Sequence, residues 1–251
     1  MRIVVAGGTG LIGSALVEAL READHEAVPA SPSTGVDTLT GEGVAEALAG
    51  ADVVVDVTNR MEFEPAAILE FFTASTRTLL AAERAAGVRH HVVLSIVGTD
   101  LLPDSGYLAA KAAQEELVRG SGVPFSIVRA TQFFEFLGMI AQGSAVGDRI
   151  VLPTADLQPV AARDVSAALA DVATAPPRGG VLDLAGPERA PFARFVRPAL
   201  AALGDGRPVD EDPATGYFGA TLERDALVPR GEARIGATDF ATWLSAQAAR
   251  V

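Results

Sequence analysis

Residues 2–13 read Arg-Ile-Val-Val-Ala-Gly-Gly-Thr-Gly-Leu-Ile-Gly, a short apolar run that leads directly into a glycine-rich turn. The run predicts a buried strand over residues 2–6, and the apolar periodicity that follows predicts a helix over 11–22. In such a unit Gly7 permits the tight turn, Gly10 lets the backbone approach a pyrophosphate, and Gly13 lets the helix pack against the strand. The amino terminus of the helix presents unpaired N–H groups to the anion. The stretch therefore predicts a dinucleotide-binding loop formed by Gly7, Thr9, Gly10, Leu11, Ile12 and Gly13.

The rest of the chain alternates short Val- and Ile-rich runs with longer Ala- and Leu-rich periodic stretches, a pattern typical of a parallel sheet with crossover helices. The 251 residues predict a single α/β domain built on a doubly wound parallel sheet. Beyond about residue 130 glycine and proline recur, so residues 131–251 are expected to contribute a substrate-binding cap made of insertions. The expected strands cover residues 26–29, 53–57, 91–95, 125–130, 149–152, 159–160 and 181–184, and the expected helices cover 43–48, 66–86 and 107–121.

Composition disfavours several classes of protein. Apolar residues make up 49% of the chain and charged residues 21%, and no apolar stretch reaches the length of a membrane span. A net charge of −12 would repel nucleic acid. The chain has no cysteine, and a strand that starts at residue 2 leaves no room for a signal segment, so we expect a cytoplasmic protein. Its expected partner is a small-molecule substrate, and the expected state is a monomer or homodimer. The three histidines, His25, His90 and His91, lack a carboxylate at metal-ligand spacing, so no metal is assigned.

One lysine stands among the 20 lysine and arginine residues, and it follows one of the two tyrosines by four positions. On a helix this spacing places Tyr107 and Lys111 on the same face. A neighbouring ammonium group favours a phenolate, so we expect it to bring the pKa of Tyr107 from about 10 towards neutral. The pair predicts acid–base chemistry, and the alternatives are a surface pair on an exposed helix and an arginine bias that removed the other lysines.

Polar residues follow the strands expected at the centre of the sheet. Thr58 and Asn59 come after the strand over 53–57, and Ser95 ends the strand over 91–95. Wound α/β proteins bind ligands at the carboxyl edge of the sheet, so Thr58 and Asn59 are expected to line a cofactor channel. The Ser95 hydroxyl is expected to hold a substrate carbonyl oxygen beside Tyr107, while Lys111 addresses the cofactor ribose.

The type of cofactor depends on the residues after the second strand, which read Ala-Ser-Pro-Ser-Thr-Gly over 30–35. An acidic residue here would accept the ribose hydroxyls of NAD and repel a 2′-phosphate. No carboxylate is present in this stretch, and Ser31 and Ser33 can donate hydrogen bonds to a phosphate, although the arginine that often binds it is also missing. The stretch favours NADP over NAD, and the alternative interpretation is a turn without a binding role.

These features resemble the short-chain dehydrogenase/reductase superfamily. The Gly-Gly-Thr-Gly-Leu-Ile-Gly turn and the Ala-Thr-Gln-Phe-Phe stretch at 130–134 are most similar to its atypical, NmrA-like NAD(P)-binding branch, whose substrate-site border the segment over 159–165 also resembles. The resemblance implies a Rossmann-like fold and assigns the superfamily's catalytic Ser, Tyr and Lys to Ser95, Tyr107 and Lys111. It also implies cofactor contacts at Ala130 and Thr131. The Val-Thr-Asn at 57–59 departs from the usual Asn-Ala-Gly segment.

Together these observations predict an NAD(P)H-dependent oxidoreductase that reduces a carbonyl or similarly polarised double bond, with Tyr107 as the proton donor. The apolar side chains of Phe133, Phe134, Phe136 and Met139 are expected to form a wall for an aromatic substrate or, alternatively, a buried helix face. Two other functions stay open. The protein would be either a non-catalytic NADP sensor, as many NmrA-like proteins are, or an isomerase or epimerase that retains its nicotinamide.

Overall fold

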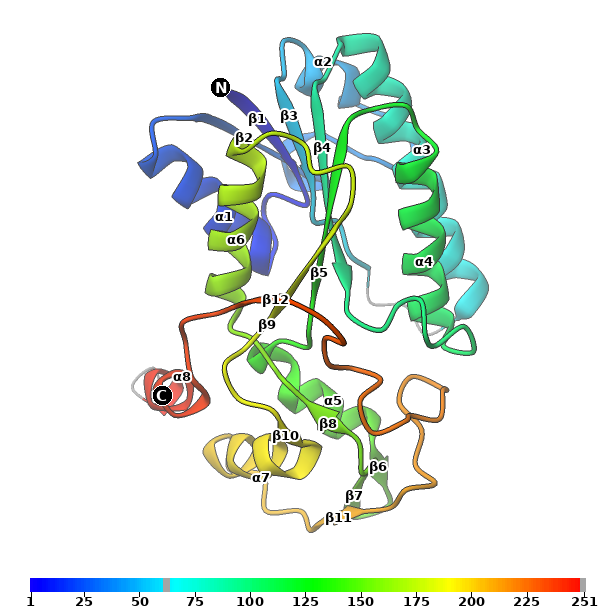
Figure 1. The fold of residues 1–251 in the computed structure, drawn as a ribbon, viewed down its shortest axis with the longest axis vertical. Helices are drawn as coiled ribbons and strands as arrows, with labels where there is room; N and C mark the ends of the chain where they lie inside the picture. The colour runs from blue at the N-terminus through cyan, green and yellow to red at the C-terminus, as the bar shows by residue number, and fades with distance from the viewer. Residues whose placement is uncertain (61–63, 249–251) are drawn as a thin grey trace.

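The computed structural model describes residues 1–60 and 64–248, which form a seven-stranded, entirely parallel sheet with helices on both faces (Figure 1). The strand order is β12-β9-β5-β4-β3-β1-β2. This arrangement confirms the expected α/β class and the doubly wound sheet. The strands are β1 (Arg2–Ala6), β2 (Glu26–Ala30), β3 (Val53–Asp56), β4 (His90–Ile96), β5 (Phe125–Ala130), β9 (Val181–Ala185) and β12 (Ala233–Ile235).

Helices α1 (Leu11–Glu22) and α6 (Ala162–Thr174) cover one face of the sheet, and α3 (Pro65–Ala86) and α4 (Gly106–Arg119) cover the other, with the short α2 (Val44–Leu48) at its margin. The helices pack through apolar stripes against the Val- and Ile-rich strands, which places two buried cores on opposite sides of one sheet. Local sequence defines the helix ends, since Pro65 opens α3, and Gly87 closes it in the left-handed region at a φ of 71°.

A second group of elements lies beyond the carboxyl ends of the strands, in the lower part of Figure 1. Its own core surrounds the fully buried rings of Phe134, Phe192 and Phe195. We call this part the cap. Its elements are η2 (Phe134–Phe136), α5 (Leu137–Gly143), β6 (Ala145–Val146), β7 (Arg149–Leu152), β8 (Asp156–Leu157), β10 (Ala190–Pro191), α7 (Phe192–Ala202), β11 (Val209–Glu211) and α8 (Phe240–Ala248).

Expected and observed elements differ mainly in the second half of the chain. The expected pieces over 2–6, 11–22, 125–130 and 149–152 have the bounds that the structure gives them. The piece expected over 159–160 is wrong as a strand, because Val160 makes only a single bridge, to Phe133, and the strand lies earlier, at β8. The chain also returns to the main sheet through α6, β9 and β12, so the residues after 131 do not belong to the cap alone. No described helix combines the length and apolarity needed to cross a bilayer.

Candidate cofactor and substrate site

The glycine turn between β1 and α1 has the geometry of an anion-binding loop. Gly7 has a φ of +79°, and its N–H donates to the carbonyl oxygen of Ala30. A Cβ on Gly13 would overlap the carbonyl oxygen of Gly7, whereas Gly10 is the exposed N-cap of α1 with no side chain over the helix terminus. The first turn of α1 contains no acidic residue, so its free N–H groups are open to a negatively charged group. The turn therefore fits the pyrophosphate of a dinucleotide.

A cavity of about 220 Å³ is lined by residues at the carboxyl edge of the sheet and by residues of the cap. It reaches Leu11 and Ile12 next to the glycine turn, at the place where strand order reverses between β1 and β3. Crevices at such reversals are the usual ligand sites of open α/β sheets. The cavity is lined by Leu11, Ile12, Val57, Thr58, Asn59, Arg60, Leu94, Ser95, Ile96, Tyr107, Leu108, Lys111, Ala130, Thr131, Gln132, Phe133, Phe136, Met139, Ile140, Tyr217 and Phe218.

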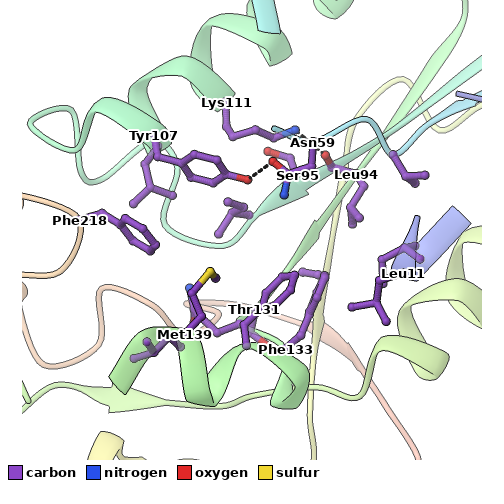
Figure 2. A pocket seen from close by; sticks show the side chains of 18 of the residues that line it. Leu11, Asn59, Leu94, Ser95, Tyr107, Lys111, Thr131, Phe133, Met139 and Phe218 are labelled. Carbon is purple, nitrogen blue, oxygen red and sulfur yellow. Dashed lines mark hydrogen bonds between the residues drawn. The ribbon is translucent and has the colours of Figure 1, made fainter. Parts of the chain in front are cut away.

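Tyr107 lies in the first turn of α4, which Ser105 caps by accepting a hydrogen bond from the N–H of Leu108. The phenol of Tyr107 donates to Oδ1 of Asn59 over 2.8 Å, and its ring stacks against Phe218 at a centroid distance of 5.9 Å (Figure 2). Burial raises the pKa of Tyr107 to about 12. The expectation of a lowered pKa is wrong, because burial outweighs the Asn59 hydrogen bond. The phenol stays protonated at neutral pH.

Lys111 lies one turn further along α4 and also lines the cavity, as the four-residue spacing predicts. Its Nζ donates to the carbonyl oxygen of Leu94 over 2.8 Å and to the side-chain oxygen of Gln114, and it lies 4.5 Å from the centroid of the Phe72 ring. These contacts hold the ammonium group without any hydrogen bond to Tyr107. Burial lowers the pKa of Lys111 to about 8, although Asp56 and Glu115 oppose the shift.

Ser95 reaches the cavity, but its hydroxyl donates to Oε1 of Glu115 over 2.6 Å. Glu115 also accepts two hydrogen bonds from Arg129, both of 2.8 Å, so a buried ion pair fixes the carboxylate. The structure thus brings Ser95, Tyr107 and Lys111 to one cavity, while each polar group has a separate partner. For Ser95 to hold a substrate oxygen, its proton would have to leave Glu115.

The remaining predicted cofactor residues lie either at the cavity wall or beside the glycine turn. Ala130 ends β5 at the cavity wall and Thr131 follows it, with its hydroxyl donating to the carbonyl oxygen of Gln158. Thr58 donates through its N–H and hydroxyl to Asp56 at the end of β3. The other two residues, Ser31 and Ser33, lie outside the cavity lining and next to the glycine turn, where each contacts Thr9.

The aromatic run after β5 divides between the cavity and the core. Phe133 and Phe136 stack at a centroid distance of 5.2 Å and line the cavity together with Met139. Phe133 and Met139 face Tyr107 across the cavity (Figure 2). Phe134 instead lies in the cap core. Both interpretations of the run therefore apply, each to different residues, and the cavity is largely apolar.

Several residues of the site were not predicted from the sequence. Tyr217 and Phe218 line the cavity but come from a cap segment without periodicity, and Gln132 lines it within the stretch over 130–134 that carries the family resemblance. Gln114 links the site to β3 by donating to Asp56 over 2.9 Å. Asp56 directly follows three valines in the sequence. A carboxylate at the end of a buried strand needs polar partners, and this signal could have drawn attention to the network.

Comparisons with known proteins agree with a dinucleotide site at the glycine turn. Residues 7–176 match the protein-family model described as NAD(P)H-binding. An NAD(P)H azoreductase of Xenophilus azovorans is 28% identical over 242 residues, which cover 88% of this chain and 78% of that protein.

Two solved structures share the fold. MoeE5 in complex with UDP-glucose and NAD has a TM-score of 0.73 and 20% identity, with 99% of this chain and 98% of that chain covered. A short-chain dehydrogenase/reductase superfamily protein from Agrobacterium tumefaciens with bound NAD has a TM-score of 0.72 and 22% identity, with 99% and 96% covered. The resemblance expected from the glycine turn is therefore confirmed, and the chain belongs to the NAD(P)H-binding family.

Proposed function

We propose that the protein is an NAD(P)H-dependent reductase that transfers a hydride to a carbonyl or other polarised double bond of a small aromatic molecule. The observation that carries the proposal is a half-buried phenol, that of Tyr107, which is protonated at neutral pH and lines an apolar cavity that reaches the glycine turn. The similarity to an NAD(P)H azoreductase over 88% of the chain supports reduction of a polarised double bond.

Residues at two places in the fold would bind the cofactor. The N–H groups of the first turn of α1 would hold the pyrophosphate, and Thr58, Asn59, Ala130 and Thr131 would line the path of the nicotinamide half. When bound, the nicotinamide supplies the hydride. We propose NADPH rather than NADH, because the exposed hydroxyls of Thr9 and Ser33 lie 3.3 Å apart beside the turn, in a stretch without a carboxylate.

Tyr107 supplies the proton. With a pKa of about 12 the phenol is protonated at neutral pH, so it can donate to an oxygen or nitrogen that becomes basic as the double bond is reduced. Asn59 holds the phenol in place before the acceptor arrives. Lys111 adds a positive charge one helical turn away, which stabilises developing negative charge at the wall of a largely apolar cavity. Ser95 remains a candidate contact to the acceptor, with Glu115 as its resting partner.

The test uses Tyr107→Phe, which keeps the ring contacts with Phe72 and Phe218 and removes only the proton donor. We expect unchanged NADPH affinity and a fall in turnover of at least 100-fold with aromatic carbonyl, quinone and azo acceptors. Thr174→Ala, at an exposed helix end away from the cavity, is the matched control. Wild-type protein that binds NADPH but reduces no acceptor would favour an NADP sensor. Product formation without net cofactor oxidation would favour an isomerase.

A further inference from the structure

Two buried polar residues lie behind the cavity wall, and the proposed chemistry does not use them. Asp56 at the end of β3 and Gln114 on α4 are each 1% exposed, and neither lines the cavity. A carboxylate taken out of water costs free energy unless charges or hydrogen-bond donors surround it. The groups that surround Asp56 therefore indicate what this charge does in the fold.

Asp56 connects the segment after β3 to helix α4. Its Oδ1 accepts hydrogen bonds from the N–H and the hydroxyl of Thr58, over 2.9 and 2.6 Å, and Thr58 lines the cavity. Its Oδ2 accepts from the side-chain amide of Gln114 over 2.9 Å. The next residue, Asn59, accepts the hydrogen bond of the Tyr107 phenol. The carboxylate therefore anchors the segment that holds the proposed proton donor.

The amide of Gln114 continues the connection to Lys111. Its Nε2 donates to Asp56 and to the hydroxyl of Thr76, over 2.9 and 3.1 Å, and its oxygen accepts from Nζ of Lys111. Only one orientation of the amide satisfies these contacts, because an ammonium group only donates and a carboxylate only accepts. The amide dipole therefore lies between the two charges, with each end towards the charge of opposite sign.

Two carboxylates act on the charge of Lys111. Burial lowers the pKa of Lys111, and Asp56 on β3 and Glu115 on α4 oppose the shift. Glu115 is paired with Arg129 on β5 at 2.8 Å, whereas the three hydrogen bonds to Asp56 come from neutral groups. The charge of Asp56 is thus directed through the amide to Lys111. The other titratable groups near this network are the phenol of Tyr107 and the buried pair of His91 and Glu83.

We propose that Asp56 is a positioning residue that holds the ammonium group of Lys111 at the cavity wall through the amide of Gln114. The inference rests on the proposed function in taking the charge of Lys111 as a support for turnover. Asp56 does not line the cavity, so it acts only through Lys111 and through the segment over 58–59. One buried carboxylate thus fixes both the cation of the site and the partner of its phenol.

The experiment moves the carboxylate along the network while the shapes of the side chains stay the same. In Asp56→Asn the new NH₂ group faces either the NH₂ group of Gln114 or the N–H of Thr58, so two donors meet in both orientations. The double variant Asp56→Asn/Gln114→Glu restores the contacts. The asparagine oxygen keeps both bonds from Thr58, its NH₂ group donates to the glutamate, and the glutamate accepts from Lys111.

Lys111 reports on this network directly, because it is the only lysine of the chain and a label at its Cε gives a single NMR signal. The signal of the full wild-type chain should titrate with a pKa of about 8. We expect this midpoint to fall by about one pH unit in Asp56→Asn, and to rise by about one unit above the wild type in the double variant, where the carboxylate bonds the ammonium group itself. Gln114→Met, which removes only the amide, should lower the midpoint as well.

Asp164→Asn is the matched control for the loss of a carboxylate. Asp164 likewise accepts hydrogen bonds from the N–H and the hydroxyl of a threonine, Thr238, over 2.8 and 3.0 Å. It lies on α6, which covers the opposite face of the sheet from α4 (Figure 1). The midpoint of Lys111 should stay unchanged in this variant. A role of Asp56 in folding alone would not reverse the sign of the shift between the single and the double variant.

Turnover gives the second measurement. The decrease of kcat/KM at high pH should begin about one unit lower in Asp56→Asn than in the wild type, and about one unit higher in the double variant. The inference is overturned if the midpoint of Lys111 is the same in Asp56→Asn and the wild type, or if kcat/KM does not follow the midpoints. Either result, in a protein that oxidises NADPH, leaves the reductase intact. Midpoints that shift in the expected order in a protein that never oxidises NADPH would support the network and disprove the reductase.

Discussion

The pH dependence of stability gives a sharp test of the site, because Lys111 is the only lysine and the chain has no cysteine. Burial lowers the pKa of Lys111 from 10.5 to about 8. A difference of about 2.5 units corresponds to about 3 kcal/mol that the buried ammonium costs the folded state near neutral pH. The unfolded chain holds this proton more tightly, so between about pH 8 and 10.5 it binds more protons than the folded protein. Stability from this group must therefore increase with pH.

The assay is urea unfolding of the wild type and of Lys111→Met at pH 7, 8, 9 and 10. Between pH 8 and pH 10 the free energy of unfolding of the wild type should rise by about 2 kcal/mol relative to the variant. The difference between the two proteins removes the contribution of the two tyrosines to stability. Because their pKa values are raised, that contribution decreases with pH above about pH 10. At pH 7 the variant should be about as stable as the wild type, because relief of the buried charge offsets the loss of the bonds to Leu94 and Gln114.

Parallel stability curves for the two proteins would refute this reasoning, since they would show that Lys111 has the same pKa in the folded and unfolded states. Activity gives a second readout. If the ammonium charge supports turnover, kcat/KM of the wild type should fall about tenfold per pH unit above pH 8. The rise in stability should begin at the pH at which kcat/KM starts to fall, near pH 8.

Two further predictions concern the sheet and the glycine turn. The fully buried Nδ1 of His91 lies 2.8 Å from Oε1 of Glu83, and although burial alone would lower the pKa of His91, this carboxylate raises it. Glu83→Gln should therefore cost about 3 kcal/mol at pH 6. The cost should shrink as urea titrations move towards pH 9, because stability from the protonated ring is lost as the pH rises through the folded pKa; a cost independent of pH would contradict the pairing. Gly13→Ala should weaken NADPH binding at least tenfold in a fluorescence titration, because its Cβ meets the Gly7 carbonyl. The control Gly143→Ala has open space around it and should leave the affinity unchanged.

Local pattern was enough to predict the first half of the fold. The strand, glycine turn and helix over residues 2–22 lie next to one another in sequence, so periodicity and φ requirements determine them without tertiary context. The same holds for Tyr107 and Lys111, which share a helix face because of their spacing. The direction of each polar group could not be predicted in this way. Ser95 turns to Glu115 because a carboxylate on a neighbouring helix, itself fixed by Arg129, lies within reach.

The cap residues escaped prediction for a different reason. Tyr217 and Phe218 reach the cavity through long-range packing of the cap, and the segment around them carries no periodicity. The signal for Tyr217 was its rarity, since the other tyrosine of the chain was already a candidate. The left-handed φ of Phe218, 46°, is visible only in the fold.

The single lysine has a structural reason beyond the arginine-rich composition of the chain. Its Nζ lies where the carbonyl oxygen of Leu94 and the side-chain oxygen of Gln114 accept hydrogen bonds, with the ring of Phe72 beside it. A guanidinium carries five N–H donors in a rigid plane and stays charged at any working pH. These two oxygens would leave several of its donors unpaired in a site that is 4% exposed. Lysine therefore fits the site, and its lowered pKa is the consequence of holding a cation against the cavity wall.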